Sequence, residues 1–102
     1  SEPVAPRTEA VAAYDGDRLE VDPLGRVELQ LPGSGADTDW EGALIAGEEK
    51  RPLPVGSTLD SRHGRFYWRL GPGYRGEYEL EFTNRATGAT HRVTVEVHGK
   101  PL

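Results

Sequence analysis

The sequence has no cysteine among its 102 residues, and this absence excludes several chemistries at once. Without thiols the chain can form no disulfide, no thiolate zinc site and no cysteine nucleophile. A fold without disulfides suits a reducing compartment and also a bacterial exterior, so the cysteine count does not decide the compartment. A chain of this length forms one domain, and its folding buries roughly two-thirds of the unfolded surface, which is enough for a core without cross-links.

Long hydrophobic runs and excess positive charge are also missing. No stretch approaches the ~20 apolar residues of a membrane-spanning helix, and the N-terminal residues lack the basic-then-apolar layout of a signal peptide. If the protein is exported, we therefore expect this chain to be a mature or excised part. Acidic residues outnumber basic ones by 17 to 12, and the resulting net charge of −5 opposes binding to phosphate backbones and anionic lipid. We expect no nucleic-acid partner and no membrane insertion.

Alternating apolar residues dominate the second half of the chain. Phe66 and Trp68 alternate with Tyr67 and Arg69, which is the period of a strand with one buried face. The same pattern predicts that Trp68 is buried and Tyr67 substantially exposed. The alternation of apolar and polar residues recurs in two further runs of this half of the chain. The residues that we expect to form the core are Phe66, Trp68, Tyr78, Leu80, Phe82, Val93, Val95 and Val97.

Shorter alternating runs, separated by proline and glycine, predict strands in the first half as well. The expected strands are 18–22, 26–31, 40–46 and 59–60, and the proline-rich 51–54 can only be an edge or an extended segment. No run has helical periodicity, so we expect an all-β, antiparallel β-sandwich of about seven strands. We assign 14–102 to this domain and 1–13 to a linker or loosely docked N-terminal segment.

A series of short motifs runs through 53–78. They are Leu-Pro-Val-Gly at 53–56, Leu-Asp to Gly at 59–64, an aromatic strand at 65–70, Gly-Pro-Gly at 71–73 and Gly-Glu-Tyr at 76–78. In this half the chain resembles the bacterial immunoglobulin-like and cadherin-like modules. The resemblance implies an immunoglobulin-like β-sandwich that serves as a spacer, adhesive or docking unit in secreted and cell-surface proteins, in the extracellular space or the periplasm.

Three residues of these motifs have a structural role that follows from their chemistry. We expect Asp60 to cap the backbone of the turn that follows it, and Gly64 to relieve strain where φ is positive. Tyr78 is suited to bury its ring and to return its hydroxyl to a nearby carbonyl.

Cadherin-type modules often bind calcium, which takes six to eight oxygen ligands. The acidic turn residues of this sequence are too few for such a site, and we interpret them as solvated turn aspartates. They are Asp15, Asp17, Asp37 and Asp39. We therefore predict that calcium and zinc do not stabilise the fold.

Neither the histidines nor the serines form a pattern typical of a reactive site. His63, His91 and His98 lie in a turn, at a strand start and in the C-terminal tail, and none has a partner at metal-ligand spacing. The serines occur in turn-like sequence without a nucleophile elbow or a positioned base. We predict no catalytic residue, no metal ligand and no cofactor.

The outward groups of the central strand are the candidate binding residues. Tyr67 and Arg69 would face solvent, with Tyr74 in the following loop, and aromatic rings beside arginine are enriched at interaction hot spots. Cross-strand stacking on the outer face is the structural alternative. We expect truncation of Tyr67 or Tyr74 to alanine to weaken the binding of a partner without a large change in the melting temperature of the domain. The outward row Glu77, Glu79 and Glu81 is interpreted instead as a device for solubility and against edge pairing.

Two functions from different classes remain open at this point. The first is a non-catalytic immunoglobulin-like interaction or spacer module of a larger exported or cell-surface bacterial protein, whose partners are neighbouring domains or another protein. The alternative is a carbohydrate-binding module whose glycan would stack on Tyr67, Tyr74 and Trp40. Binding to a glycan array would separate the two.

Overall fold

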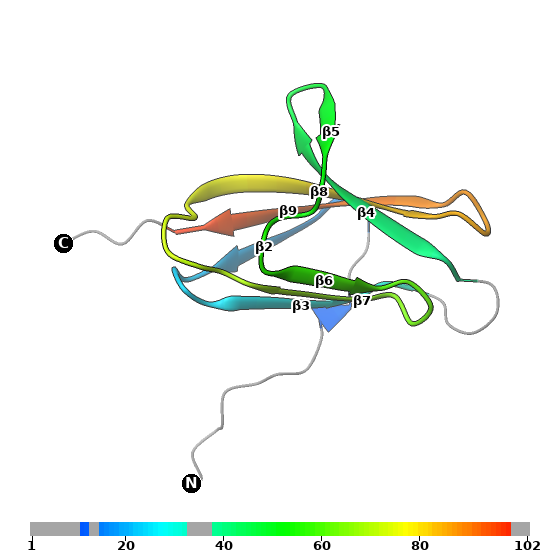
Figure 1. The fold of residues 1–102 in the computed structure, drawn as a ribbon, viewed down its shortest axis with the longest axis horizontal. Helices are drawn as coiled ribbons and strands as arrows, with labels where there is room; N and C mark the ends of the chain where they lie inside the picture. Colours follow the sequence, from blue (N-terminus) through cyan, green and yellow to red (C-terminus); the bar gives the residue numbers. More distant parts are fainter. Residues whose placement is uncertain (1–10, 13–14, 33–37, 99–102) are drawn as a thin grey trace, which may run out of the picture.

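The computed structural model describes residues 11–12, 15–32 and 38–98, and these ranges contain strands and turns only (Figure 1). The strands are β1 (Val11–Ala12), β2 (Asp17–Val21), β3 (Arg26–Gln30), β4 (Trp40–Ala46), β5 (Glu49–Arg51), β6 (Ser57–Asp60), β7 (Arg65–Arg69), β8 (Gly76–Asn84) and β9 (Thr90–Val97). Within these ranges no helix is long and apolar enough to cross a membrane.

Two sheets form the layers of a β-sandwich, which confirms the predicted fold class. The four-stranded sheet has the order β1-β3-β7-β6, and the five-stranded sheet has the order β2-β9-β8-β4-β5. Two edge pairings are parallel, β1 with β3 and β2 with β9, and the other pairings are antiparallel. The β2 pairing joins Asp17 to Val93 and Val21 to Val97, so the first half of the chain closes onto the last strand.

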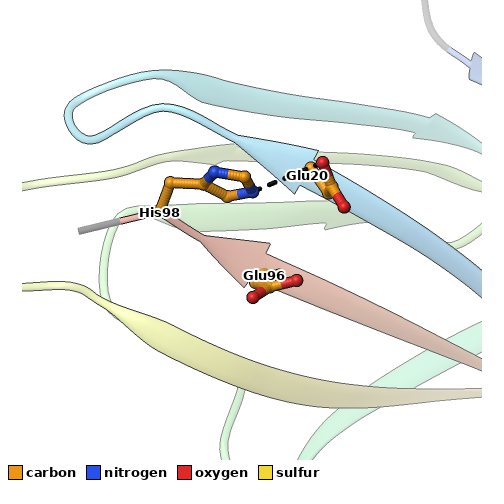
Figure 2. A group of neighbouring side chains, drawn as sticks. All are labelled: Glu20, Glu96 and His98. Atoms are coloured by element: carbon orange, nitrogen blue, oxygen red, sulfur yellow. Dashed lines mark ion pairs between the residues drawn. The ribbon is translucent and has the colours of Figure 1, made fainter. Parts of the chain in front are cut away.

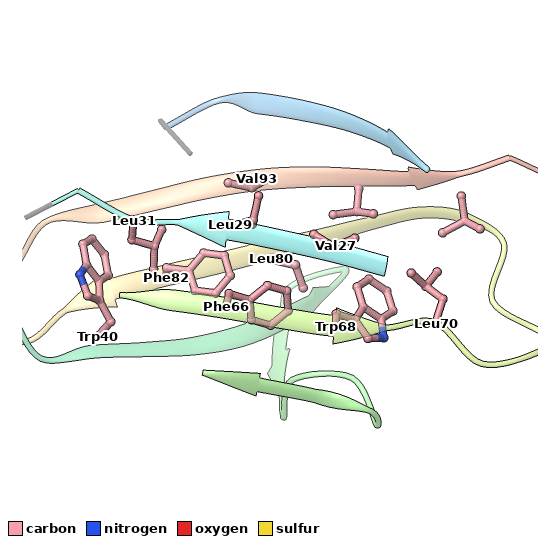
Figure 3. Close-up of a cluster of buried hydrophobic side chains, with 12 residues drawn as sticks. Val27, Leu29, Leu31, Trp40, Phe66, Trp68, Leu70, Leu80, Phe82 and Val93 are labelled. Carbon is pink, nitrogen blue, oxygen red and sulfur yellow. The ribbon is translucent and has the colours of Figure 1, made fainter. Parts of the chain in front are cut away.

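The core lies between the two sheets, where side chains of β3 and β7 face those of β8 and β9 (Figure 3). Trp68 is completely buried and Tyr67 is half-buried, so the register predicted for β7 is confirmed and Tyr67 is less exposed than expected. Of the eight expected core residues only Tyr78 is incompletely buried. The buried hydrophobic residues of the described ranges are Val27, Leu29, Leu31, Trp40, Phe66, Trp68, Leu70, Leu80, Phe82, Val93, Val95 and Val97.

The turn between β6 and β7 forms as its sequence predicts. The Asp60 carboxylate accepts hydrogen bonds from the backbone amides of Arg62 and His63 at 3.1 and 3.2 Å. Gly64 has a φ of +67°, and its carbonyl accepts a 2.7 Å bond from the Leu31 amide. This turn therefore fixes the end of β3 against the start of β7.

The Tyr78 hydroxyl accepts a hydrogen bond from the backbone, whereas the sequence predicted that it would donate one to a carbonyl. The donor is the amide of Arg75, at 3.0 Å. The Tyr78 ring meets Trp68 edge-on, with the ring centroids 5.5 Å apart. The loop before β8 brings the Arg75 amide within reach of the hydroxyl, because Arg75 is only three residues from Tyr78.

Part of the expected N-terminal segment can be placed. β1 adds an edge to the four-stranded sheet, where Val11 pairs with Leu29 and Ala12 with Gln30. The assignment of 1–13 to a linker or loosely docked segment stays a prediction. The rest of that segment lies outside the described residues.

The glutamates of β8 do not protect an edge, because β8 is the middle strand of the five-stranded sheet. Each of them is in an ion pair. Glu77 pairs with Arg18 and Glu79 with Arg92. Glu81 is only 8% exposed and lies 3.0 Å from Lys50 Nζ and 3.1 Å from Arg92 Nε. The row therefore ties β8 to β2, β9 and β5, which the sequence interpretation missed.

Glu81 makes the stability of the domain sensitive to acid. The hydrogen bond from Lys50, helped by that from Arg92, holds the pKa of this carboxyl below its ordinary value of 4.5, although burial opposes the shift. A lowered folded-state pKa stabilises the protein above the unfolded pKa, and this stabilisation is lost as pH falls through the folded-state value. We expect the urea midpoint to fall as the pH drops toward and below the ordinary carboxyl pKa of 4.5, and to fall less in Glu81→Gln. The control is Glu48→Gln in the exposed β4–β5 turn, which should keep the acid sensitivity of the parent.

Candidate docking surface

The structure separates the sequence-predicted binding residues. Tyr67 and Arg69 lie on the outer face of β7, as expected. Tyr74 lies in the next loop, but its ring packs edge-on against Trp68 at a centroid distance of 5.1 Å, and its hydroxyl donates a 3.3 Å hydrogen bond to the Val55 carbonyl. Tyr74 therefore helps to close the core, and its removal should also lower stability.

Trp40 is not available to a ligand. Its side chain is 1% exposed and packs against the ring of His91, with the centroids 5.5 Å apart. Stacking of a sugar on an indole requires a free ring face. The part that the carbohydrate alternative gave to Trp40 is therefore wrong.

A surface that the sequence analysis did not identify lies at the β2–β3 turn. Leu24 is 66% exposed and has a φ of +62°, the left-handed region that a branched side chain adopts at a cost of about 1–2 kcal/mol. Two backbone hydrogen bonds hold the turn, one from the Gly25 amide to Asp22 at 3.0 Å and one from the Leu70 amide to Gly25 at 3.0 Å. The fold thus holds an apolar side chain in solvent in a strained conformation.

Two hollows flank this leucine. One, of about 250 Å³, is lined by Leu24, Gly25, Arg26 and Arg69. The other, of about 170 Å³, is predominantly apolar. Its lining is Pro23, Leu24, Gly71, Pro72, Gly73, Tyr74, Arg75 and His98. We name the two hollows and the leucine between them the Leu24 surface; it brings Arg69 and Tyr74 to one end of the sandwich and leaves Tyr67 outside.

The arginines of the first hollow are not neutralised. Arg26 and Arg69 are direct partners across β3 and β7, an arrangement of like charges that destabilises a sheet. Among the described residues neither has a carboxylate partner. In contrast, four other arginines of the described ranges form ion pairs. They are Arg18, Arg51, Arg85 and Arg92.

The acidic and histidine residues considered for metal binding have partners of their own. Asp15 accepts a 2.8 Å hydrogen bond from the Arg92 amide, and Asp39 pairs with Arg85 at 3.2 Å. His63 lies 2.9 Å from Asp60, and its side-chain hydrogen bond is the largest of the causes that lower the pKa of the Asp60 carboxyl. Asp37 lies outside the described residues.

Comparison with known proteins identifies the fold. The sequence matches no protein-family model, and no curated protein is similar to it. An Ig domain in the complex of titin M10 with obscurin-like 1 is similar in structure, with a TM-score of 0.53 and 16% sequence identity over 87% of this chain and 93% of that chain. The fold is immunoglobulin-like.

A second structural match is to a portion of a larger protein. A protein named as an alpha-galactosidase of Bacteroides fragilis aligns with a TM-score of 0.60 and 18% identity over 83% of this chain. The chain spans 17% of the length of that protein. At such identity the two similarities establish the architecture only.

Proposed function

We propose that this domain is a non-catalytic interaction or spacer module of a larger exported or cell-surface bacterial protein, and that it docks a protein segment through the Leu24 surface. The observation that carries the proposal is the strained, exposed Leu24 between two unpaired arginines and an apolar hollow. Arginine is enriched at interaction hot spots, and the apolar side chain beside it adds surface that a partner can bury. The bacterial and cadherin-like parts of the resemblance stay predictions.

The charges of the surface indicate the chemistry of the partner. Arg26 and Arg69 offer two guanidinium groups without carboxylates, and a guanidinium binds a carboxylate through paired N–H donors. The apolar hollow on the other side of Leu24 suits an aliphatic or aromatic side chain. We therefore propose a partner segment in which acidic residues flank an apolar one.

The path of the chain suits a spacer as well. The Gly16 amide binds the Arg92 carbonyl near the start of β9, and the His98 amide binds the Val21 carbonyl just past its end. Six residue steps along β9, from Arg92 to His98, separate these points by about 20 Å. Residues 16 and 98 thus lie at opposite ends of the sandwich, and the Leu24 surface lies at the end that carries His98.

Selection from a library of displayed peptides tests the proposal. We expect the peptides retained by the parent domain to be enriched in Asp or Glu beside a large apolar residue. Arg69→Glu should lose them, because the new carboxylate would pair with Arg26 and repel an acidic ligand. Arg62→Glu is the matched control, since Arg62 is an exposed arginine at the other end of the same sheet.

Leu24→Gly separates binding from stability. Glycine adopts a φ of +62° without strain, so the melting temperature of this variant should not fall, whereas its affinity for the selected peptides should fall about tenfold or more. Peptides without acidic bias, or equal binding by parent, Leu24→Gly and Arg69→Glu, would contradict the proposal.

A further inference from the structure

A row of three glutamates crosses the outer face of the five-stranded sheet. Glu96 on β9 is the direct partner of Glu20 on β2 and of Glu77 on β8. One guanidinium, that of Arg18, serves two of them, with a 2.7 Å hydrogen bond to Glu96 and an ion pair with Glu77. Like charges on directly opposed residues destabilise a sheet, so this row carries a local excess of negative charge.

His98 completes a mixed donor set at one end of this row. Its backbone amide donates a 3.0 Å hydrogen bond to the Val21 carbonyl, which places the side chain beside the end of β2. Its Nε2 lies 3.3 Å from Glu20 Oε1, the contact drawn as a dashed line in Figure 2. One ligand atom from each of Glu20, Glu96 and His98 lies within 4.8 Å of the others.

These separations suit a small metal ion. Donors bound tetrahedrally at about 2.0–2.1 Å from zinc lie about 3.3 Å apart, which is the distance already present between His98 and Glu20. A carboxylate oxygen of Glu96 lies within 4.8 Å of both of these donors and must move closer to reach the same centre. The hydrogen bond that Arg18 donates to Glu96 would then orient this carboxylate toward the metal ion, as groups that hydrogen-bond to metal ligands commonly do.

We propose that Glu20, Glu96 and His98 bind a divalent transition-metal ion, with Zn²⁺ as the ion that best suits one imidazole and two carboxylates. A histidine donor favours zinc over calcium, which requires six to eight oxygens. All three side chains are accessible to solvent, so water can fill the fourth position. Because the ligands come from β2 and from the end of β9, the ion would fasten the first half of the chain to the last strand.

The spacing of the histidines along the chain did not indicate this site. Metal motifs are recognised by ligands close together in sequence, whereas Glu20 meets His98 only through the parallel pairing of β2 with β9. Binding should therefore depend on the fold and should stabilise it, so this proposal replaces the prediction from the sequence that zinc does not stabilise the fold.

Titration calorimetry with Zn²⁺, together with thermal unfolding, tests the proposal. We expect the parent domain to bind one equivalent, its melting temperature to rise with zinc, and EDTA to reverse the rise. His98→Ala and Glu20→Gln should each bind at least about tenfold more weakly. His63→Ala is the matched control, because His63 is also exposed and paired with an acid, Asp60. It should bind zinc as the parent does, and calcium should shift no melting temperature.

Three results would overturn the proposal. They are the absence of zinc binding at millimolar concentration, undiminished binding by His98→Ala, and a loss of affinity in His63→Ala equal to that in His98→Ala. Since His98 and Glu20 are exposed, both variants should fold, and their melting temperatures without metal give the check.

Discussion

Trp68→Ala is expected to lower the free energy of unfolding by about 3–5 kcal/mol. The indole is completely buried between the sheets, and the rings of Tyr74 and Tyr78 meet it edge-on at 5.1 and 5.5 Å. Removal of this side chain leaves a cavity that the surrounding strands cannot close, and it takes away the surface on which both tyrosines pack. For a domain of this size the loss is a large part of the total stability.

Tyr67→Ala is the matched control for that prediction. Tyr67 is the next residue on β7, but its side chain lies half-buried on the outer face, opposite Glu28 and Thr58. Its truncation should cost only about 1 kcal/mol. Urea denaturation measures the difference in the free energy of unfolding between the two variants, provided that both have the same dependence on urea concentration. Equal midpoints would mean that the two faces of β7 are assigned incorrectly.

Gly64→Ala is expected to cost about 2–5 kcal/mol, which combines two penalties. The backbone has a φ of +67°, so a side chain there is strained by about 1–2 kcal/mol. A Cβ at this position would also lie 3.1 Å from the Trp40 ring and 3.2 Å from Leu31 Cβ, both of which are buried and cannot move away freely. Such overpacking costs about 1–3 kcal/mol.

Gly47→Ala isolates the backbone part of that cost. Gly47 has a φ of +66°, almost the value at Gly64, but no atom lies within 4 Å of the position of its Cβ. We expect a loss of about 1–2 kcal/mol in this variant, measured by the same urea titration. If the two alanine variants unfold at the same midpoint, crowding by Trp40 and Leu31 does not contribute, and the packing of the β6–β7 turn on the core is described incorrectly.

The conformation of individual strands and turns could be predicted because local sequence decides it. The alternation over 65–70 places Trp68 inside, since successive side chains of a strand point to opposite faces. Asp60 and Gly64 act within their own turn, so the local sequence pattern was sufficient to predict the roles of both residues.

The candidate sites could be predicted only in part. Arg69 was identified because it lies at an outward position of a recognisable strand. Its pairing with Arg26, however, is decided by the register of β3 against β7. Leu24 carried a signal that was not used, since it is an apolar residue at the tip of a turn between Pro23 and Gly25.

The sequence by itself determined the all-β class, the faces of the principal strands and the absence of thiol chemistry, because these follow from residue type and from a period of two. Only the tertiary structure decided that β2 pairs in parallel with β9, that β8 lies in the middle of its sheet, and which charged groups meet. The physical reason is that strand pairing joins segments far apart in the chain by backbone hydrogen bonds, which every sequence can form. The choice among pairings therefore depends on how the whole core packs, and the contacts of Arg26 with Arg69 and of Glu20 with His98 follow from that choice.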